Sequence, residues 1–226
     1  MTELRTHWLG LDLCSPLVVG ASPLVDDLDT IRRLADAGAG AIVMRSLFEE
    51  QLVAEELAFH RYFDQRVDLD AEAQSFLPDI EADAGSVSYL RLLQKLQDAL
   101  DVPVVASING TSPGGWAKYA VDLDDAGADA IELNLYEVAT RLDEPGHAVE
   151  DRQLEVVQSV VESVGVPVSV KISPFYASVP AFVARLADVG ARGVVVFNRF
   201  YQPDIDLETL DVGHVRLGWK RRHPTE

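Results

Sequence analysis

The sequence predicts an α/β fold with a parallel sheet, and three observations lead to that prediction. First, segments with helical periodicity alternate with short apolar runs along most of the 226 residues. Second, these runs are nearly continuous rather than alternating, which is typical of strands buried on both faces. Third, a unit of helical pattern, glycine and apolar run recurs in LADAGAGAIVMRS (34–46), LDDAGADAIELNL (123–135) and LADVGARGVVVFN (186–198).

The individual elements follow from these patterns. The segment THWLGLDLCS predicts an N-terminal β-hairpin that turns near Gly10. Gly38, Gly127 and Gly190 suit the left-handed position that closes a helix. Region 47–84 is mixed, with a candidate helix followed by an acidic loop. Strands are expected at about 16–20, 41–45, 103–108, 129–134, 167–172 and 193–197, and helices at about 26–37, 86–99, 113–126, 148–164 and 178–189.

Polar residues at the ends of five apolar runs favour a barrel over an open sheet. A barrel gathers its strand ends around one mouth, whereas an open sheet gathers fewer of them near its switch point. No G-x-G-x-x-G sequence follows the first strand. We therefore expect an incomplete (β/α)8 TIM-barrel type fold with about six strand–helix units. The polar residues are Arg45 and Ser46, Ser107 and Asn109, Asn134, Lys171 and Ser173, and Asn198 and Arg199.

The domain prediction is one incomplete barrel domain at 1–212, followed by an irregular basic tail at 213–226. The last 13 residues, HVRLGWKRRHPTE, hold four of the 19 basic residues and one of the 37 acidic residues. This reversal of charge motivates the hypothesis that the reading frame is interrupted near residue 212.

Composition and charge limit the function classes. The formal net charge of −18 argues against binding to nucleic acid and to anionic membranes. The single cysteine, Cys14, excludes internal disulfides and cysteine-based zinc sites, and we expect it to be buried. No metal site is predicted. No apolar run approaches the ~18 residues of a membrane span, and the N-terminus lacks the pattern of a signal peptide, so we expect a cytoplasmic protein.

Lys171 is the most informative polar residue, because lysine in an apolar strand is costly unless it is paired. It points either into the barrel mouth or outward to solvent. In the mouth it could neutralise a phosphate, hold a developing anion or form a Schiff base. Asn134 and Asn198 end two copies of the repeat, and their amides suit the edge of a planar heterocycle. The alternative is that they cap loops.

Three further positions have a functional and a structural reading. The loop that begins at Asn109 either binds a ligand or supplies a helix N-cap. Arg45 either contributes to the mouth or pairs with the glutamates that follow it, Glu49 and Glu50. Glu137, beside Tyr136, is either an acid–base group with a raised pKa or a solvated loop glutamate.

The order of these segments resembles the dihydroorotate dehydrogenase family of FMN-dependent (β/α)8 barrels. THWLGLDLCSPLVVGAS is similar to that family's opening hairpin and first strand, and AIVMRS to its Thr-Lys-Ser strand end, with arginine in place of lysine. ASINGTS is similar to its Ser-Ile-x-Gly segment, and IELNLYEVAT to Glu-Leu-Asn-Leu-Ser-Cys-Pro-Asn. VSVKISP and VVVFNR are similar to its lysine strand and to a later strand that ends in asparagine. The resemblance covers about residues 5–210.

The resemblance implies FMN as cofactor and a small pyrimidine-like substrate. Family members remove a proton from a dihydropyrimidine ring with a base and pass a hydride to the flavin, and a lysine beside the flavin stabilises negative charge on the reduced ring. A homodimer and a place in pyrimidine biosynthesis are also implied. The implied FMN contacts are Ala21, Ser22, Arg45, Asn109, Asn134 and Lys171, and the implied substrate contacts are Asn134 and Asn198.

The sequence departs from the family where the base and the phosphate site would stand. Tyr136-Glu137-Val138-Ala139 replaces Ser-Cys-Pro-Asn, so Glu137 or Tyr136 would have to accept the proton. Strands 7 and 8, which usually hold the phosphate, are not visible. We therefore expect impaired activity or a different substrate. Two alternatives remain: a Schiff-base lyase that uses Lys171, and a non-catalytic remnant.

Overall fold

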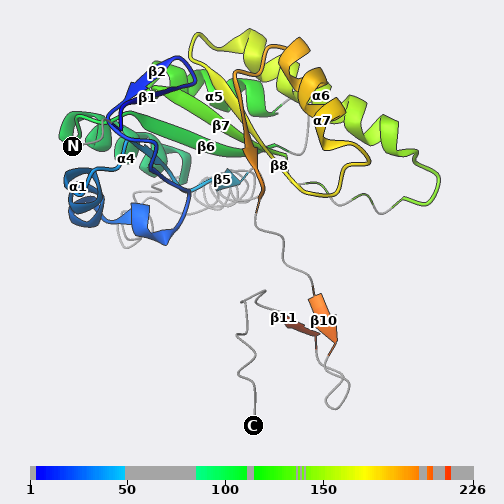
Figure 1. The fold of residues 1–226 in the computed structure, drawn as a ribbon, viewed down its shortest axis with the longest axis horizontal. Helices are drawn as coiled ribbons and strands as arrows, with labels where there is room; N and C mark the ends of the chain where they lie inside the picture. The colour runs from blue at the N-terminus through cyan, green and yellow to red at the C-terminus, as the bar shows by residue number, and fades with distance from the viewer. Residues whose placement is uncertain are drawn as a thin grey trace, which may run out of the picture.

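The computed structural model describes residues 4–48, 85–110, 115–135, 137, 139, 141–198, 203–205 and 212–214, and its centre is one parallel sheet (Figure 1). The strand order in this sheet is β3-β4-β6-β7-β8-β9, with β5 paired beside β6. All pairings within it are parallel. The α/β class and the parallel sheet expected from the sequence are therefore confirmed.

The expected strands and helices are present, with ends that differ by at most a few residues. The sheet strands are β3 (Val18–Val19), β4 (Ala41–Val43), β5 (Leu47–Phe48), β6 (Val104–Gly110), β7 (Ala130–Leu135), β8 (Val168–Ile172) and β9 (Gly193–Val196). The helices are η1 (Pro23–Asp26), α1 (Leu28–Asp36), α4 (Gly85–Ala99), α5 (Gly115–Asp125), α6 (Gly146–Ser163) and α7 (Val179–Asp188). The N-terminal hairpin consists of β1 (Thr6–Trp8) and β2 (Leu11–Leu13).

The recurring glycine closes three helices in the same way. The φ angles of Gly38, Gly127 and Gly190 are +101°, +93° and +97°, a region that favours glycine. The backbone N–H of the residue after each glycine donates to the carbonyl of the residue five positions before that donor. One example is Ala39 N to Leu34 O at 3.1 Å. This is the hydrogen bond of a Schellman motif, so the helix closure inferred from the repeat is confirmed.

The two faces of the sheet have different partners. One face carries Ile131, Leu133 and Val170, which belong to the main apolar core together with buried helix residues such as Leu93 and Phe182. The other, which we call the inner face, carries the residues that alternate with these along each strand. The sheet is therefore covered by helices on one side only in the part of the chain that the structure describes.

The N-terminal hairpin covers the start of the inner face. Leu9, at its tip, forms a small apolar cluster with Val43, Val105 and Ala130. A Cβ added at Gly193 in β9 would lie 2.5 Å from a methyl group of Leu9, which shows how closely the hairpin approaches the sheet. The hairpin closes the amino-terminal end of the inner face and leaves the carboxyl ends of the strands as the place for polar groups.

Tyr89 of α4 takes the place of a strand partner where the pairing of β6 is interrupted. β4 pairs with β6 at Val105, and β5 resumes the pairing at Ile108, so the backbone of Ser107 faces the gap between them. The Tyr89 hydroxyl accepts a hydrogen bond from Ser107 N at 2.9 Å and donates one to Ser107 O at 3.3 Å. Burial raises the pKa of this hydroxyl far above its ordinary value, so it stays a donor.

We expect Tyr89→Phe to lower the free energy of unfolding by about 1–3 kcal/mol, because it leaves a buried N–H and a buried C=O without partners. Chemical denaturation followed by circular dichroism measures this change. Tyr176→Phe is the matched control, because its hydroxyl donates only to the side chain of Gln153. If both variants lose the same stability, the backbone role of Tyr89 is wrong.

Two features differ from the sequence analysis. Cys14 is exposed, so the expectation that it is buried is wrong. It lies where the chain bends out of the hairpin, and its Sγ donates to Ala39 O at 3.5 Å. β10 (Pro203–Ile205) and β11 (Val212–His214) form an antiparallel hairpin that was not predicted. The candidate helix and acidic loop of 49–84 and the tail at 215–226 lie outside the described residues.

No helix in the described part of the chain is long and apolar enough to cross a membrane.

Candidate functional site

The inner face becomes polar toward the carboxyl ends of β6, β7 and β8. Ser107, Glu132 and Ser169 align across these three strands, and Asn109, Asn134 and Lys171 align two residues further along. Aligned residues of parallel strands point to the same face, so two rows of polar groups lie beyond the apolar cluster under the hairpin. We call these two rows and their partners from neighbouring strand ends the polar layer.

Hydrogen bonds join four strand ends within this layer. Ser46, after β4, shares a hydrogen bond with Ser107 at 2.8 Å. Asn134 Nδ2 donates to Ser46 Oγ at 2.8 Å, and Asn198 Nδ2, after β9, donates to Asn134 Oδ1 at 3.4 Å. The structure therefore brings together Asn134 and Asn198, which the sequence singled out separately. Asn134 is 4% exposed, so its amide is part of the layer and caps no surface loop.

Lys171 also points to the inner face. Its Nζ lies 3.3 Å from Oε1 of Glu132, and the two side chains are 16% and 4% exposed. Ser107 Oγ donates to the same carboxylate oxygen at 3.4 Å. A solvent-facing Lys171 is thereby excluded, and only a small part of its side chain is exposed.

Asn109 completes the second row but has an unused group. The residue is 8% exposed, and its Oδ1 has no hydrogen-bond partner among the residues that the structure describes. A buried carbonyl oxygen without a partner is unfavourable, and it can be satisfied by a donor on a ligand. Thr111 and Ser112, the alternative N-cap residues of that loop, lie outside the described residues.

The other predicted cofactor contacts lie apart from these hydrogen bonds. Ala21 packs against the apolar cluster under the hairpin, and Ser22 precedes the short helix η1. Arg45 forms an ion pair with Asp26 at 3.2 Å, and its side chain is 64% exposed. Glu49 and Glu50, its alternative partners, are outside the described residues. Within the part of the chain that the structure describes, no hydrogen bond or ion pair joins Ala21, Ser22 or Arg45 to the polar layer.

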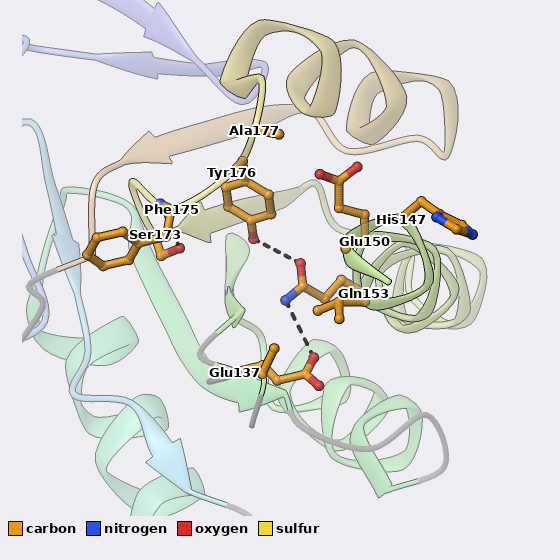
Figure 2. Close-up of a pocket in the computed structure, with 11 residues that line it drawn as sticks. Glu137, His147, Glu150, Gln153, Ser173, Phe175, Tyr176 and Ala177 are labelled. Atoms are coloured by element: carbon orange, nitrogen blue, oxygen red, sulfur yellow. Dashed lines mark hydrogen bonds between the residues drawn. The ribbon is translucent and has the colours of Figure 1, made fainter. Parts of the chain in front are cut away.

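The carboxylate of Glu137 contacts side chains of α6. It pairs with Arg152 of α6 and accepts a hydrogen bond from Gln153 at 3.5 Å. Figure 2 shows the side chains of Glu137, Gln153 and Tyr176 pointing toward one another, and Tyr176 donates to Gln153 at 2.9 Å. Tyr136 lies outside the described residues.

A cavity of about 830 Å³ lies beside this chain of contacts. α6 lines it with His147, Glu150 and Gln153, and the segment after β8 lines it with Phe175 and Tyr176 (Figure 2). Glu150 is itself paired with Arg185 at 3.0 Å. Neither Lys171 nor Asn134 lines the cavity, whereas Ser173, two residues beyond Lys171, does.

Sequence reasoning missed the residues that hold the candidate site in place. Tyr89 and Arg152 lie on helices, where they look like ordinary members of an amphipathic pattern. Glu132 carried a signal, because it alternates with Asn134 in an apolar strand, and the structure confirms that both face the same side. Among the described residues, no group of three or more histidine, cysteine or acidic side chains could hold a metal ion.

Burial raises the pKa of the Glu132 carboxyl above its ordinary value of 4.5, while Lys171 and the hydrogen bond from Ser107 oppose that rise. The folded state thus binds this proton more tightly than the unfolded state, and the contribution of Glu132 to stability falls as pH rises above 4.5.

We expect the free energy of unfolding, relative to Glu132→Gln, to decrease from pH 4.5 toward neutrality. Urea titrations of both proteins across this range measure it, and a difference that grows with pH would contradict it.

Comparison with known proteins gives a consistent set of relatives, although no protein-family model matches the chain. A dihydroorotate dehydrogenase B (NAD(+)) catalytic subunit from Methanosarcina acetivorans is 30% identical over 207 residues, which cover 88% of this chain and 62% of that protein. The subunit of the same name from Methanocella arvoryzae is 28% identical over 207 residues, covering 88% and 63%. The chain thus spans less than two thirds of the length of these relatives.

Solved structures match only in part. A candidate dihydrodipicolinate synthetase from Pseudomonas aeruginosa aligns with a TM-score of 0.47 and 19% identity, over 79% of this chain and 54% of that chain. A likeness of this size carries no argument about function.

Proposed function

From the premise that this chain is a dihydroorotate dehydrogenase-like protein, we propose that it is an FMN-dependent oxidoreductase acting on a CH–CH bond of a small, pyrimidine-like substrate. The curled sheet is then part of a (β/α)8 barrel, and the polar layer lies at the mouth. The observation that carries the proposal is the location of a partly exposed cation, Lys171, beside two linked amides, Asn134 and Asn198, at the carboxyl ends of the strands.

The residues of the polar layer fit the ring edge of a flavin. That edge carries alternating N–H and C=O groups, which need acceptors and donors in one plane. The buried Oδ1 of Asn109 offers an acceptor that has no partner among the described residues, and Lys171 offers a charged donor. When bound, the flavin would supply the hydride acceptor. The protein would supply orientation and a fixed positive charge close to where negative charge develops.

Each of the other members of the layer has a supporting role. Ser46 and Asn198 hold the amide of Asn134 from both sides, which fixes the direction of its donor and acceptor. Preorganised dipoles of this kind stabilise a charged transition state without a cost of reorganisation. Asn198 is the more exposed of the two asparagines, and we assign it to the substrate.

The substrate is proposed to differ from dihydroorotate. The family's cysteine or serine base is replaced, and Glu137, the candidate substitute, has its carboxylate engaged by Arg152 and Gln153. Each of its two oxygens contacts a side chain of α6, which leaves this carboxylate poorly placed to take a proton from a substrate in the polar layer. A substrate whose proton is already acidic, or whose oxidation needs no protein base, suits this site better.

The test is anaerobic reduction of the flavin-loaded protein, followed by loss of visible flavin absorbance. We expect dihydroorotate to reduce the flavin at least about a hundredfold more slowly than a chemical reductant of similar potential, since loss of a positioned base removes about 10²–10⁴-fold in rate. Rapid reduction by dihydroorotate would overturn the altered-substrate proposal and leave the oxidoreductase proposal intact. A protein that binds no flavin would overturn both.

The geometry does not favour the alternative of a Schiff-base lyase. Lys171 would need a free amine to attack a carbonyl, and its Nζ is instead held by Oε1 of Glu132 at 3.3 Å. Borohydride trapping of carbonyl compounds separates the two functions: the flavin proposal predicts no adduct at Lys171. A homodimer also remains a proposal, which sedimentation velocity tests.

A further inference from the structure

We propose that Glu132 is a positioning residue for Lys171: its buried carboxyl group, one row deeper in the sheet, holds the lysine amine and fixes the direction of the lysine side chain. The inference deepens the proposed function, but its first test does not depend on a bound flavin. Glu132 itself is 3% exposed, so it acts through Lys171 rather than by touching a ligand.

The pair is diagonal across two neighbouring strands. Glu132 in β7 aligns with Ser169 in β8, whereas Lys171 aligns with Asn134, one row further toward the strand ends. Diagonal neighbours on one face of a sheet lie within reach of long side chains. The Nζ of Lys171 therefore leans back toward the buried row and meets Oε1 of Glu132 at 3.3 Å.

The carboxylate is itself held in place. Ser107 Oγ donates to Oε1 of Glu132 at 3.4 Å. The backbone N–H and C=O of Ser107 both form hydrogen bonds with the hydroxyl of Tyr89. The position of Lys171 is thus connected through Glu132 and Ser107 to helix α4. A chain of contacts like this supports a charged group more precisely than a single surface ion pair does.

A structural role alone does not account for Glu132. A buried ion pair is often no more stable than apolar residues of the same volume, because both charges lose their water. One row deeper on the same face, Val105 of β6 is apolar and fully buried without such a pair. What a glutamate adds at this position is control over the direction of Lys171.

The first test measures the reactivity of Lys171 in the protein without flavin. An acylating reagent attacks a lysine amine that it can reach and that is not engaged by a partner, so peptide mapping by mass spectrometry at a fixed pH reports how firmly each amine is held. Lys95 and Lys118 are exposed and serve as internal references. We expect Lys171 to be acylated more slowly than both, and Glu132→Gln to increase its rate at least about fivefold relative to them, because loss of the ion pair frees the amine from the buried row.

Two further variants keep the test decisive. Ser169→Ala is the matched control, because Ser169 aligns with Glu132 in the neighbouring strand but contacts Ile131 O rather than Lys171. It should leave the relative rate of Lys171 unchanged. Glu132→Asp retains the charge on a shorter side chain and should give an intermediate rate. Should Glu132→Gln fail to fold, Glu132→Asp must still change the rate, and an unchanged rate in a folded variant overturns the proposal.

The second test uses the flavin-loaded protein. If Glu132 holds a cation beside the ring, the midpoint potential of the flavin in Glu132→Gln shifts to a more negative value than in the unchanged protein, because the reduced, anionic ring loses stabilisation. Ser169→Ala should not shift it. An altered acylation rate without any flavin binding would sustain the positioning role and refute the flavin function, so the two failures are distinguishable.

Discussion

Lys171→Met is expected to destabilise the fold by about 3–5 kcal/mol, because it leaves the carboxylate of Glu132 buried without its cation. Of the substitutions in the polar layer, we expect this one to have the largest effect. Thermal and chemical denaturation of the purified variant measure the loss. A loss below about 1 kcal/mol would mean that the contact with Glu132 is weak in solution.

The double variant Lys171→Met with Glu132→Gln separates stability from function. Replacing both members of a buried pair by neutral residues is often nearly neutral or even stabilising. We therefore expect the double variant to recover most of the lost stability but not the affinity for FMN, which should stay reduced by at least about tenfold, equivalent to 1.4 kcal/mol. Recovery of both properties would contradict the assignment of Lys171 to the flavin.

Gly40→Ala is expected to lower the free energy of unfolding by about 3 kcal/mol or more, at or above the upper end of ordinary overpacking. Gly40 immediately precedes β4, and a Cβ at this position would lie 2.0 Å from the backbone oxygen of Ser15. A backbone atom cannot move aside as the end of a flexible side chain can. The crossing of the chain segment after β2 over the start of β4 therefore requires glycine here.

Gly20→Ala provides the control for this prediction. Gly20 lies just after β3, is exposed, and a Cβ there would meet no atom within 4 Å. Both proteins can be compared by urea denaturation under identical conditions. Equal stabilities for the two variants would show that the segment at Ser15 moves freely away from β4.

Local sequence patterns predicted the sheet and its helices well. The same steric rule that places glycine in the left-handed region closes three helices at Gly38, Gly127 and Gly190, so the repeat could be read without a structure. Glu132 and Asn134 lie two residues apart in β7 and therefore face the same side of the sheet. Asn134, Lys171 and Asn198 were all placed at strand ends, because polar groups in apolar strands must find partners.

The features that the sequence did not predict depend on contacts between distant segments of the chain. Tyr89 reaches Ser107 because the pairing of β6 is interrupted between β4 and β5. No local sequence pattern indicates this interruption. Glu137 was considered as a free acid or base, and in a chain with 37 acidic residues the sequence does not say which of them Arg152 will bind. Cys14 was expected to be buried from its residue type, but the bend after β2 turns it outward.

These contacts also divide the candidate residues into two groups. Lys171, Asn134 and Asn198 lie within one connected layer, and Asn109 completes one of its rows. Glu137 belongs to a different network that runs from Arg152 through Gln153 to Tyr176. The candidate residues at the strand ends therefore share one network, while Glu137 belongs to a separate network on α6.

The most direct test of the central claim is the visible absorption spectrum of the protein, purified after expression and again after incubation with FMN and removal of the unbound cofactor. We predict the absorbance bands of a bound flavin in one or both samples, with a spectrum shifted from that of free FMN and a stoichiometry near one per chain. The bands should be weaker in Lys171→Met combined with Glu132→Gln, in line with its reduced affinity. A folded protein that stays colourless after incubation would contradict the assignment of the polar layer as a flavin site.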